Sequence, residues 1–377
     1  MPERLPRVLS VFGTRPEAVK MAPVVERLAR TSGVEARVCV TAQHRQMLDQ
    51  VLRLFEIVPD FDLDVMETDQ ALAPLTEAIF RRLDPVLESF QPDWVLVQGD
   101  TTTVAATALL AYYRRIRIGH VEAGLRSGDK WQPFPEEINR KVAGAVADLH
   151  FAPTEQARAN LLRENVPSDR IVVTGNPVID ALRAIAARPY DPARGPLAAV
   201  PFDRRIILVT AHRRENFGEP LARIFRALAR LAERYRDDAT FVYPVHLNPH
   251  VREPADRMLG AIPNIMLLEP LDYLPMVHLL SRCTLILTDS GGLQEEGPAL
   301  GKPVLVLREV TERPEAIEAG TAQLVGTDAD RIETEVRRLL DDPAAYAAMA
   351  HAVNPFGDGH AAERIVDALV RRIEAGD

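Results

Sequence analysis

Short apolar runs rich in β-branched residues alternate with longer segments of helical spacing along the whole chain. This alternation is typical of parallel strands joined by helices that cover both faces of a sheet. The clearest strand candidates are residues 8–12, 36–41, 94–98, 116–120 and 149–152 in the first half and 205–210, 240–244, 265–268, 285–288 and 304–307 in the second. The sequence therefore predicts an α/β fold made of two Rossmann-like domains.

A segment rich in proline and glycine separates the two halves. Residues 187–196 read Ala-Arg-Pro-Tyr-Asp-Pro-Ala-Arg-Gly-Pro, which breaks any periodic element. The length of 377 residues exceeds what one hydrophobic core usually serves. We expect an N-terminal domain at 1–186 joined by a C-terminal helix at about 360–377, a C-terminal domain at 197–359, and a hinge at 187–196. Two such units facing one another across a cleft form the GT-B architecture, an analogy at the level of fold.

Composition narrows the class of protein. The formal net charge of −9 argues against a nucleic-acid surface, although a local basic cluster could still bind an acidic ligand. Cys39 and Cys283 lie in strand-like runs and are expected to be small buried residues rather than a disulfide or a metal site. No stretch approaches the length of a membrane span. We expect a cytoplasmic protein with no metal, no cofactor and no membrane partner.

Polar residues follow several of the strand candidates. In open α/β sheets ligands bind beyond the carboxyl ends of parallel strands, so these residues predict one large site built from both halves. The segments are Gly-Thr-Arg-Pro-Glu at 13–17, Gln-Gly-Asp at 98–100, His-Val-Glu-Ala-Gly at 120–124, Thr-Ala-His-Arg-Arg-Glu-Asn at 210–216, Pro-Val-His at 244–246 and Thr-Asp-Ser-Gly-Gly at 288–292. Their residue types are suited to holding a sugar diphosphate.

The first segment predicts a diphosphate contact at a helix start. Gly13 permits a tight turn, and Pro16 is suited to a first helical position. Arg15 and Lys20 would then lie near the positive end of the helix, where exposed amides and two cations attract phosphate. By itself this segment more often forms a solvated first turn, because neither a P-loop nor a dinucleotide glycine motif is present.

Residues 288–292 predict a second anion site. Ser290 could cap the following helix, and Gly291 and Gly292 would let the backbone approach phosphate oxygens. A carboxylate would repel a diphosphate, so Glu296 is better suited to accept hydrogen bonds from ribose hydroxyls. Arg313 is a further candidate cation, although such a residue is more often a surface arginine.

Three carboxylates and two histidines are candidates for the chemistry. Asp100 and Glu122 follow strand candidates, and Glu136 comes from a third segment; for each acid, a structural role as a cap or ion-pair partner is about equally plausible. Arg140 follows Glu136 by four residues and could simply form a helical ion pair. His212, next to Arg213 and Arg214, is suited to phosphate contact or proton transfer, and His246 is the weaker candidate.

Longer motifs are specific when they are taken together. They are Gly-Thr-Arg-Pro-Glu at 13–17, Gln-Gly-Asp-Thr-Thr-Thr at 98–103, His-Val-Glu-Ala-Gly-Leu-Arg at 120–126, Pro-Glu-Glu-Ile-Asn-Arg at 135–140, Thr-Asp-Ser-Gly-Gly-Leu-Gln-Glu-Glu at 288–296 and Asn-Pro-Phe-Gly-Asp-Gly at 354–359. In these motifs the chain resembles the non-hydrolysing UDP-N-acetylglucosamine 2-epimerases of bacteria. The resemblance implies a GT-B-like fold, interconversion of UDP-N-acetylglucosamine and UDP-N-acetylmannosamine, usually a homodimer, and a role in cell-surface polysaccharide biosynthesis.

The resemblance also implies roles for individual residues. The catalytic set carried over from the family is Asp100, Glu122 and Glu136, supported by Arg140 and His212. The nucleotide and phosphate contacts are Arg15, Lys20, His212, Leu271, Met276, Ser290, Gly291, Gly292, Glu296 and Arg313. Family members that a second substrate molecule activates use residues matching Gln43, Gln46, Arg213 and His246. In such members a basic residue precedes the glutamine matching Gln70, whereas this chain has Asp69, which weakens the expectation of activation.

The chemistry explains why acids and cations should occur together. The C2 proton of an N-acetylhexosamine has no adjacent carbonyl, so direct deprotonation would leave an unstabilised carbanion. Loss of UDP from C1 with removal of the C2 proton gives a 2-acetamidoglucal, which can add UDP again after protonation from the other face. Cations should then face the departing diphosphate and carboxylates the sugar. Which acid serves which face stays open at this stage.

Other activities fit the same inventory of motifs. A GT-B glycosyltransferase, a hydrolysing epimerase and an epimerase of a modified UDP-sugar all need a UDP-sugar site. A non-catalytic UDP-sugar sensor is disfavoured by the number of acids. A redox route through bound NAD is disfavoured by the absence of a dinucleotide glycine motif.

Overall fold

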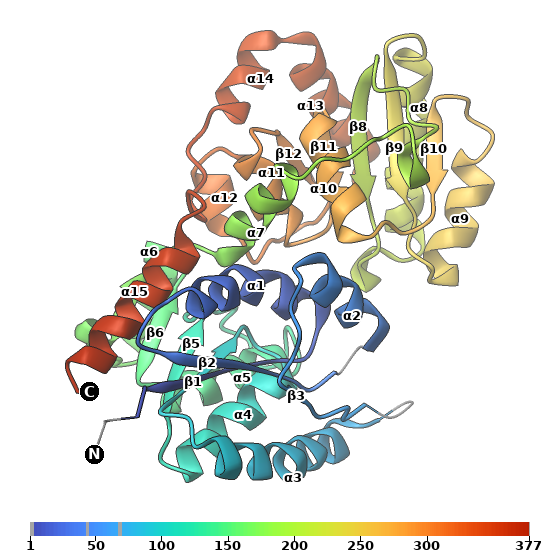
Figure 1. Ribbon diagram of the computed structural model, residues 1–377. Coiled ribbons are helices and arrows are strands. Elements are labelled where there is room, and N and C mark those ends of the chain that lie inside the picture. Colours follow the sequence, from blue (N-terminus) through green and yellow to red (C-terminus); the bar gives the residue numbers. More distant parts are fainter. Residues whose placement is uncertain (1–3, 43–44, 67–69, 377) are drawn as a thin grey trace. The chain divides into compact units, whose positions relative to one another are not determined.

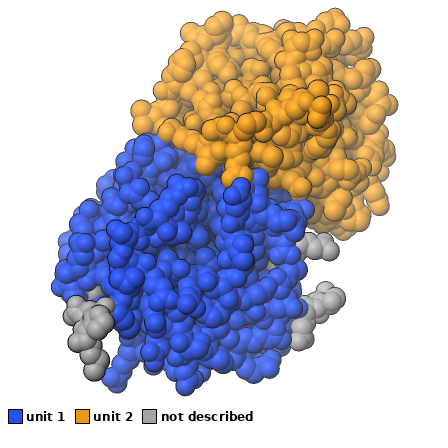
Figure 2. All heavy atoms as spheres, in the orientation of Figure 1, with its two compact units in different colours: residues 1–181, 356–377 blue, residues 182–355 orange. Residues whose placement is uncertain are grey.

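The chain forms two compact units. The computed structural model describes residues 4–42, 45–66 and 70–376 (Figure 1). Unit 1 comprises residues 1–181 and 356–377, and unit 2 comprises residues 182–355 (Figure 2). The segment 187–196, which we expected to be a hinge, lies inside unit 2. There the Tyr190 ring stacks on the His278 ring with 4.7 Å between centroids.

Unit 1 contains a seven-stranded sheet of order β3-β2-β1-β4-β5-β6-β7, in which all neighbours are parallel. Its strands are β1 (Arg7–Phe12), β2 (Glu35–Val40), β3 (Phe61–Asp62), β4 (Trp94–Gln98), β5 (Arg117–Val121), β6 (Leu149–Ala152) and β7 (Ile171–Val173). Its helices are α1 (Arg15–Ala29), α2 (Arg45–Leu54), α3 (Leu72–Phe90), α4 (Thr102–Tyr113), α5 (Glu136–Val146), α6 (Glu155–Arg163) and α15 (Ala361–Glu374). Helix α7 (Pro177–Ala186) begins in unit 1 and ends in unit 2.

The burial of residues in unit 1 agrees with the positions of its strands and helices. Every residue of β4 is buried, as expected for a central parallel strand that helices cover on both faces. Leu9 of β1 and Val97 of β4 belong to one buried cluster with Ile79 and Leu83 of α3. Helix α15, from the far end of the chain, packs on α1, where Arg27 also lies 3.5–3.6 Å from two acids of α15.

Unit 2 contains a second parallel sheet, with six strands in the order β10-β9-β8-β11-β12-β13. Its strands are β8 (Arg205–Thr210), β9 (Ala239–Pro244), β10 (Ile265–Leu268), β11 (Leu285–Thr288), β12 (Val304–Val306) and β13 (Ala322–Leu324). Its helices are α8 (Glu219–Arg234), α9 (Pro249–Leu259), α10 (Tyr273–Arg282), α11 (Leu293–Ala299), α12 (Pro314–Glu318), α13 (Ala329–Asp341) and α14 (Pro343–Ala350).

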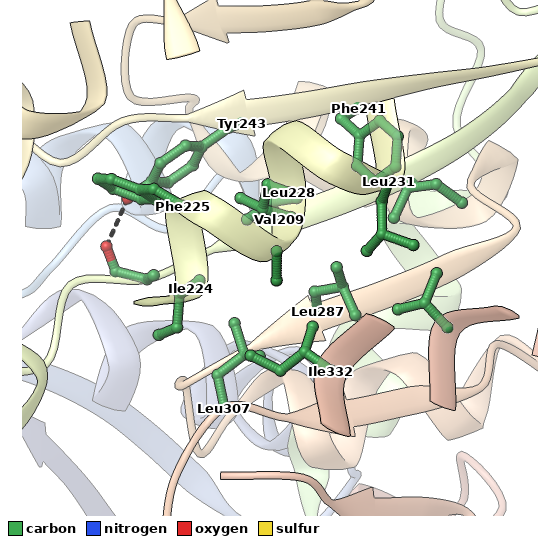
Figure 3. Close-up of a cluster of buried hydrophobic side chains, with 14 of the residues drawn as sticks. Val209, Ile224, Phe225, Leu228, Leu231, Phe241, Tyr243, Leu287, Leu307 and Ile332 are labelled. Carbon is green, nitrogen blue, oxygen red and sulfur yellow. Dashed lines mark hydrogen bonds between the residues drawn. The ribbon is translucent and has the colours of Figure 1, made fainter. Parts of the chain in front are cut away.

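The core of unit 2 packs α8 and α13 against the sheet (Figure 3). Phe225 and Leu228 of α8 lie among Tyr243 of β9, Val209 of β8 and Ile332 of α13, all fully or almost fully buried. The buried Tyr243 hydroxyl donates to the Ala211 carbonyl at 2.6 Å, the dashed line in Figure 3. Burial of the phenol raises the pKa of Tyr243. This bond anchors the segment after β8, which carries His212.

The strand candidates coincide with strands of the two sheets. Each strand candidate is a strand with bounds shifted by at most one residue, and the α/β class of two parallel sheets is confirmed. Both cysteines are buried and free, as predicted, but Cys283 is the C-cap of α10 instead of lying in a strand. No helix among the described residues is long and apolar enough to cross a membrane. The described residues also hold no group of three or more metal-ligating side chains.

Candidate active site

Asp100 and Glu122 follow neighbouring strands of the unit 1 sheet. Strands β4 and β5 pair in parallel up to Gln98 and Val121, so the residues just beyond them share one sheet edge. Gly99 adopts a φ of 84°, a conformation that a glycine reaches without strain. The Gly99 amide donates to the Val121 carbonyl at 3.0 Å, which ties the two turns together.

The Glu122 carboxylate is buried among hydrogen-bond donors. The residue is 6% exposed and its backbone has a φ of 62°, which non-glycine residues rarely adopt. Lys20 Nζ lies 2.6–2.7 Å from both carboxylate oxygens. The side-chain amides of Gln98 and Asn176 also donate to it, the second at 2.9 Å. Such charge-assisted bonds stabilise the ionised form.

A second acid, Asp100, is held by the guanidinium of Arg140. Arg140 Nε and Nη2 lie 2.9 Å and 2.6 Å from Asp100 Oδ2, and Arg140 Nη1 lies 3.2 Å from Glu137. The Glu137 carboxylate also accepts from the backbone amides of Ser127 and Gly128. Of the alternatives for Arg140, the helical ion pair forms with Glu137 rather than with Glu136, and the same guanidinium also holds Asp100.

Glu136 is the first residue of α5 and lies one turn before Arg140. Its Oε2 atom is buried and has no hydrogen-bond partner within the described residues. A buried carboxylate oxygen without a donor is costly in a folded protein, and such costs concentrate at functional sites. Glu136, like Asp100 at its Oδ1 atom, therefore keeps a carboxylate oxygen that no donor among the described residues occupies.

The start of α1 differs in detail from the prediction. Gly13 is required for packing rather than for a turn, because a Cβ there would lie 1.9 Å from Thr41 Oγ1. Thr14 is the N-cap in a capping box with Glu17, so Pro16 is the second helical residue and not the first. Arg15, the first helical residue, is half-buried.

Two buried histidines lie behind the acids. His120 of β5 and His150 of β6 are register partners, and each is 1% exposed. His120 Nε2 lies 2.8 Å from the Gly99 carbonyl and donates to it, while both Nδ1 atoms have no hydrogen-bond partner among the described residues. Burial lowers the pKa of His120 to about 4 and the pKa of His150 to about 3, so both rings are neutral near neutral pH.

In unit 2, Asp289 organises the loop that follows β8. Its Oδ2 atom accepts from the backbone amides of His212 and Arg213, each at 2.8 Å, and from the Asn216 side chain at 3.1 Å. His212 Nδ1 lies 3.4 Å from Asp289 Oδ1, and its ring stacks on His246. Burial lowers the pKa of His212, and the nearby Asp289 charge only partly opposes that shift.

The loop 288–292 lies beside this segment. Thr288 and Thr210 share a 2.6 Å hydroxyl hydrogen bond, and the Ser290 amide donates to Thr288 Oγ1. Gly292, not Ser290, is the N-cap of α11, and no side chain caps the helix, so that prediction is wrong. Gly291 lies where a Cβ would meet the Glu312 carboxylate at 2.7 Å.

The remaining predicted UDP contacts also lie in unit 2. Arg313 is buried and pairs with the buried carboxylate of Glu295, so it is not a solvated surface arginine. Glu296 accepts from the Tyr273 hydroxyl at 3.0 Å. Leu271 is buried before α10, and Met276 is half-buried within it.

The residues carried over for activation divide between the units. Gln43 and Asp69 lie outside the described residues, and the Gln46 side chain, on α2, does too. Arg213 and His246 lie in unit 2, where Arg213 is 3.5 Å from Glu312 and His246 is exposed. Activation by a second substrate molecule stays a prediction from the resemblance.

Comparisons with known proteins decide the family. Residues 26–370 match the family described as UDP-N-acetylglucosamine 2-epimerase. The chain is 57% identical over 369 residues to the UDP-N-acetylglucosamine 2-epimerase of Escherichia coli K12, covering 96% of this chain and 98% of that protein. The chain belongs to the UDP-N-acetylglucosamine 2-epimerase family. The resemblance read from the motifs is thereby confirmed, as is the assignment of the chain to the isomerases.

Solved structures of epimerases share the fold. A Neisseria meningitidis UDP-GlcNAc 2-epimerase bound to UDP-GlcNAc has a TM-score of 0.89 and 48% identity, covering 97% of this chain and 100% of that one. The UDP-GlcNAc 2-epimerase of Methanocaldococcus jannaschii has a TM-score of 0.84 and 32% identity, covering 97% and 99% of the two chains. The predicted GT-B-like class is confirmed.

Several residues of this epimerase-family site were not singled out from sequence. Gln98 and Asn176 donate to Glu122, Glu137 holds Arg140, and Asp289 and Glu295 organise unit 2. Gln98 and Asp289 belong to the polar segments 98–100 and 288–292, so their position at the end of a strand was a usable signal. Glu137 stood in a quoted motif as the neighbour of Glu136. Asn176 had only its place after a glycine and before a proline.

Proposed function

We propose that this protein interconverts UDP-N-acetylglucosamine and UDP-N-acetylmannosamine at C2, by elimination and re-addition of UDP, without net release of free sugar. The family membership and the 57% identity to the E. coli epimerase over nearly the whole chain support the substrate. The observation that carries the chemistry is the set of three carboxylates in unit 1, two of them fixed by cations and one with an unpaired buried oxygen.

The proposed reaction balances without an oxidant or a cofactor. A carboxylate takes the C2 proton, and the C2–H electron pair forms the C1=C2 double bond. The C1–O bond breaks, and its electron pair leaves with UDP. In the re-addition step a carboxylic acid protonates C2 from the opposite face, and the UDP oxygen attacks C1. Two proton-exchanging acids are therefore needed, one for each face of C2.

The contacts of the acids support a division of roles. Glu122 accepts from Lys20, Gln98 and Asn176, so it is the acid best kept ionised, and we assign it to support positive charge at C1. Glu136 Oε2 and Asp100 Oδ1 have no hydrogen bond within the described residues. We assign the two C2 proton transfers to Glu136 and Asp100, with Arg140 keeping Asp100 oriented.

Residues of unit 2 are assigned to UDP. The proposed contacts, carried over from the family together with Arg15 and Lys20, are His212, Leu271, Met276, Ser290, Gly291, Gly292, Glu296 and Arg313. The low pKa of His212 favours a neutral ring that can hydrogen-bond a phosphate or pass a proton. A homodimer and a cytoplasmic location remain predictions from the resemblance and the sequence.

The deciding experiment is proton NMR of the purified protein with UDP-N-acetylglucosamine in deuterated water. The expected result is UDP-N-acetylmannosamine with deuterium at C2 and no accumulating free sugar. Free N-acetylmannosamine would indicate a hydrolysing enzyme, and product without deuterium would refute proton exchange at C2. Glu136→Gln should stop exchange, whereas Glu155→Gln, an exposed acid on α6, should leave it unchanged.

A further inference from the structure

Glu122 depends on other side chains for its orientation. Because the residue is only 6% exposed, little solvent is available to stabilise the carboxylate. Three donors surround that carboxylate: a cation from α1, an amide from the end of β4 and the amide of Asn176 before α7. Asn176 is the member of this set that no motif or catalytic role explains.

The orientation of the Asn176 amide is fixed by its own contacts. Asn176 is 1% exposed, and its Oδ1 atom accepts from the backbone amide of Val178 at 3.2 Å. A backbone amide can only donate, so Nδ2 is the atom that faces Glu122 Oε1 at 2.9 Å. The amide therefore donates to the carboxylate, and rotation by 180° would lose both bonds.

The backbone of Asn176 is tied to the returning end of the chain. Its amide donates to the Phe356 carbonyl at 2.7 Å. A Cβ on Gly175 would lie 3.2 Å from the Gly357 Cα and 3.3 Å from the Phe356 carbonyl oxygen, so two backbones meet closely here. Unit 1 consists of two segments, the first ending at Ala181 and the second beginning at Phe356. Asn176 lies five residues before the end of the first segment. Asn176 is thus fixed where the chain leaves and re-enters unit 1.

We propose that Asn176 is a positioning residue that holds the Glu122 carboxylate for the reaction. Through its own backbone bond to Phe356, it also links this carboxylate to the point where the chain re-enters unit 1. This proposal rests on the proposed function, in which Glu122 supports charge at C1. Loss of the amide would leave Glu122 with fewer donors, so the carboxylate would be less firmly placed and less favoured in its ionised form.

The charged groups around Glu122 define what a titration would report. Lys20 from α1 is paired with the carboxylate. His120, two residues earlier on β5, is neutral near pH 7, and its charge state responds to both Glu122 and Asp100. Gln98 and Asn176 supply uncharged donors from β4 and the start of α7. Replacement of Asn176 by an uncharged residue therefore changes the donor set without changing the formal charges around Glu122.

The test compares Asn176→Ser, Asn176→Asp and a control, Asn160→Ala. A serine keeps an oxygen near the Val178 amide but is too short to bond Glu122, and aspartate keeps the shape but presents a like charge. Asn160 is matched because its side chain donates to the Gly124 carbonyl at 2.8 Å in the same unit, and none of its hydrogen bonds among the described residues reaches Asp100, Glu122 or Glu136. Steady-state turnover, thermal unfolding and the titration of Glu122 by carboxyl-¹³C NMR are measured, with the resonance assigned from Glu122→Gln.

We expect Asn176→Ser to lower kcat by about 10–100-fold with little change in KM, as for other groups that orient a catalytic ligand. The midpoint of Glu122 protonation should rise by about one pH unit, a tenfold change in that equilibrium, and by more in Asn176→Asp. Asn160→Ala should change neither quantity. An unchanged midpoint, or equal losses in the Asn176 and Asn160 variants that follow thermal stability, would overturn the proposal. Absence of wild-type epimerisation would instead refute the proposed function, and the NMR titration would still decide the role of Asn176.

Discussion

The buried histidine pair predicts an acid sensitivity of unit 1 that can be isolated by one substitution. The perturbation is His150→Gln, compared with the wild type between pH 8 and pH 5. In the folded state burial lowers the pKa of His120 to about 4 and the pKa of His150 to about 3, against about 6.5 in an unfolded chain. The unfolded state therefore binds more protons below pH 6.5, and folding stability falls as the pH drops.

The size of this loss follows from the linkage relation. At pH 5 an unfolded histidine is almost fully protonated, whereas the folded ring is almost fully neutral. Each ring then costs about 2 kcal/mol of unfolding free energy at pH 5 relative to pH 8. Glu17 and Asp180 act with the opposite sign, because burial raises the pKa of each carboxyl. Their contributions are common to both proteins and cancel in the difference.

The assay is urea unfolding followed by tryptophan fluorescence. Both tryptophans of the chain, Trp94 and Trp131, lie in unit 1, so the signal reports that unit. Between pH 8 and pH 5 the wild type should lose about 2 kcal/mol more unfolding free energy than His150→Gln, whatever the variant loses at pH 8. If the wild type and His150→Gln lost the same unfolding free energy between pH 8 and pH 5, the argument that the folded state keeps the His150 ring neutral would be refuted.

Three further predictions concern substitutions at individual residues of the two units. Gly13→Ala should destabilise unit 1 by about 1–3 kcal/mol because its methyl group meets Thr41, and Thr41→Ala in the same chain should recover part of that loss in urea unfolding. Asp289→Asn should lower the unfolding free energy by about 1–3 kcal/mol, since it removes a charged acceptor from two backbone amides. It should also weaken UDP binding, as measured by isothermal titration calorimetry. Asp100→Asn and Glu136→Gln should each reduce C2 deuterium exchange at least about 100-fold while UDP binding persists; exchange within tenfold of the wild type would contradict their roles.

Much of the fold follows from the sequence, because central parallel strands must be apolar on both faces. The buried strand β4 and its counterparts were predicted with nearly correct bounds for this reason. Strands β3, β7 and β13 were not named, because each has only two or three residues and lies at an end of its sheet. A run that short carries no readable period, and pairing with a neighbour decides its conformation.

The site was predictable where position after a strand was informative. Asp100 and Glu122 share one sheet edge as expected, because parallel strands that pair bring their ends together. The partners of these acids were less accessible to sequence reasoning. Arg140 pairs with Glu137 at the i,i+3 spacing and with Asp100 from another segment, and helical spacing alone could not choose between Glu136 and Glu137 as its partner. Asn176 contacts Glu122 across 54 positions of sequence, a relation that only the folded sheet creates.

Unit 1 is built from two stretches of chain separated by the whole of unit 2. During synthesis residues 182–355 are therefore complete before Phe356 and α15 leave the ribosome. Domains fold as units while the chain grows, so unit 2 can reach its final form while α1 still lacks its contact with α15. The Phe356 carbonyl that fixes Asn176 is also added late. The surroundings of Glu122 are thus completed only after unit 2 has been synthesised, and a chain that stops before Phe356 would contain a complete unit 2 and an unfinished acid cluster in unit 1.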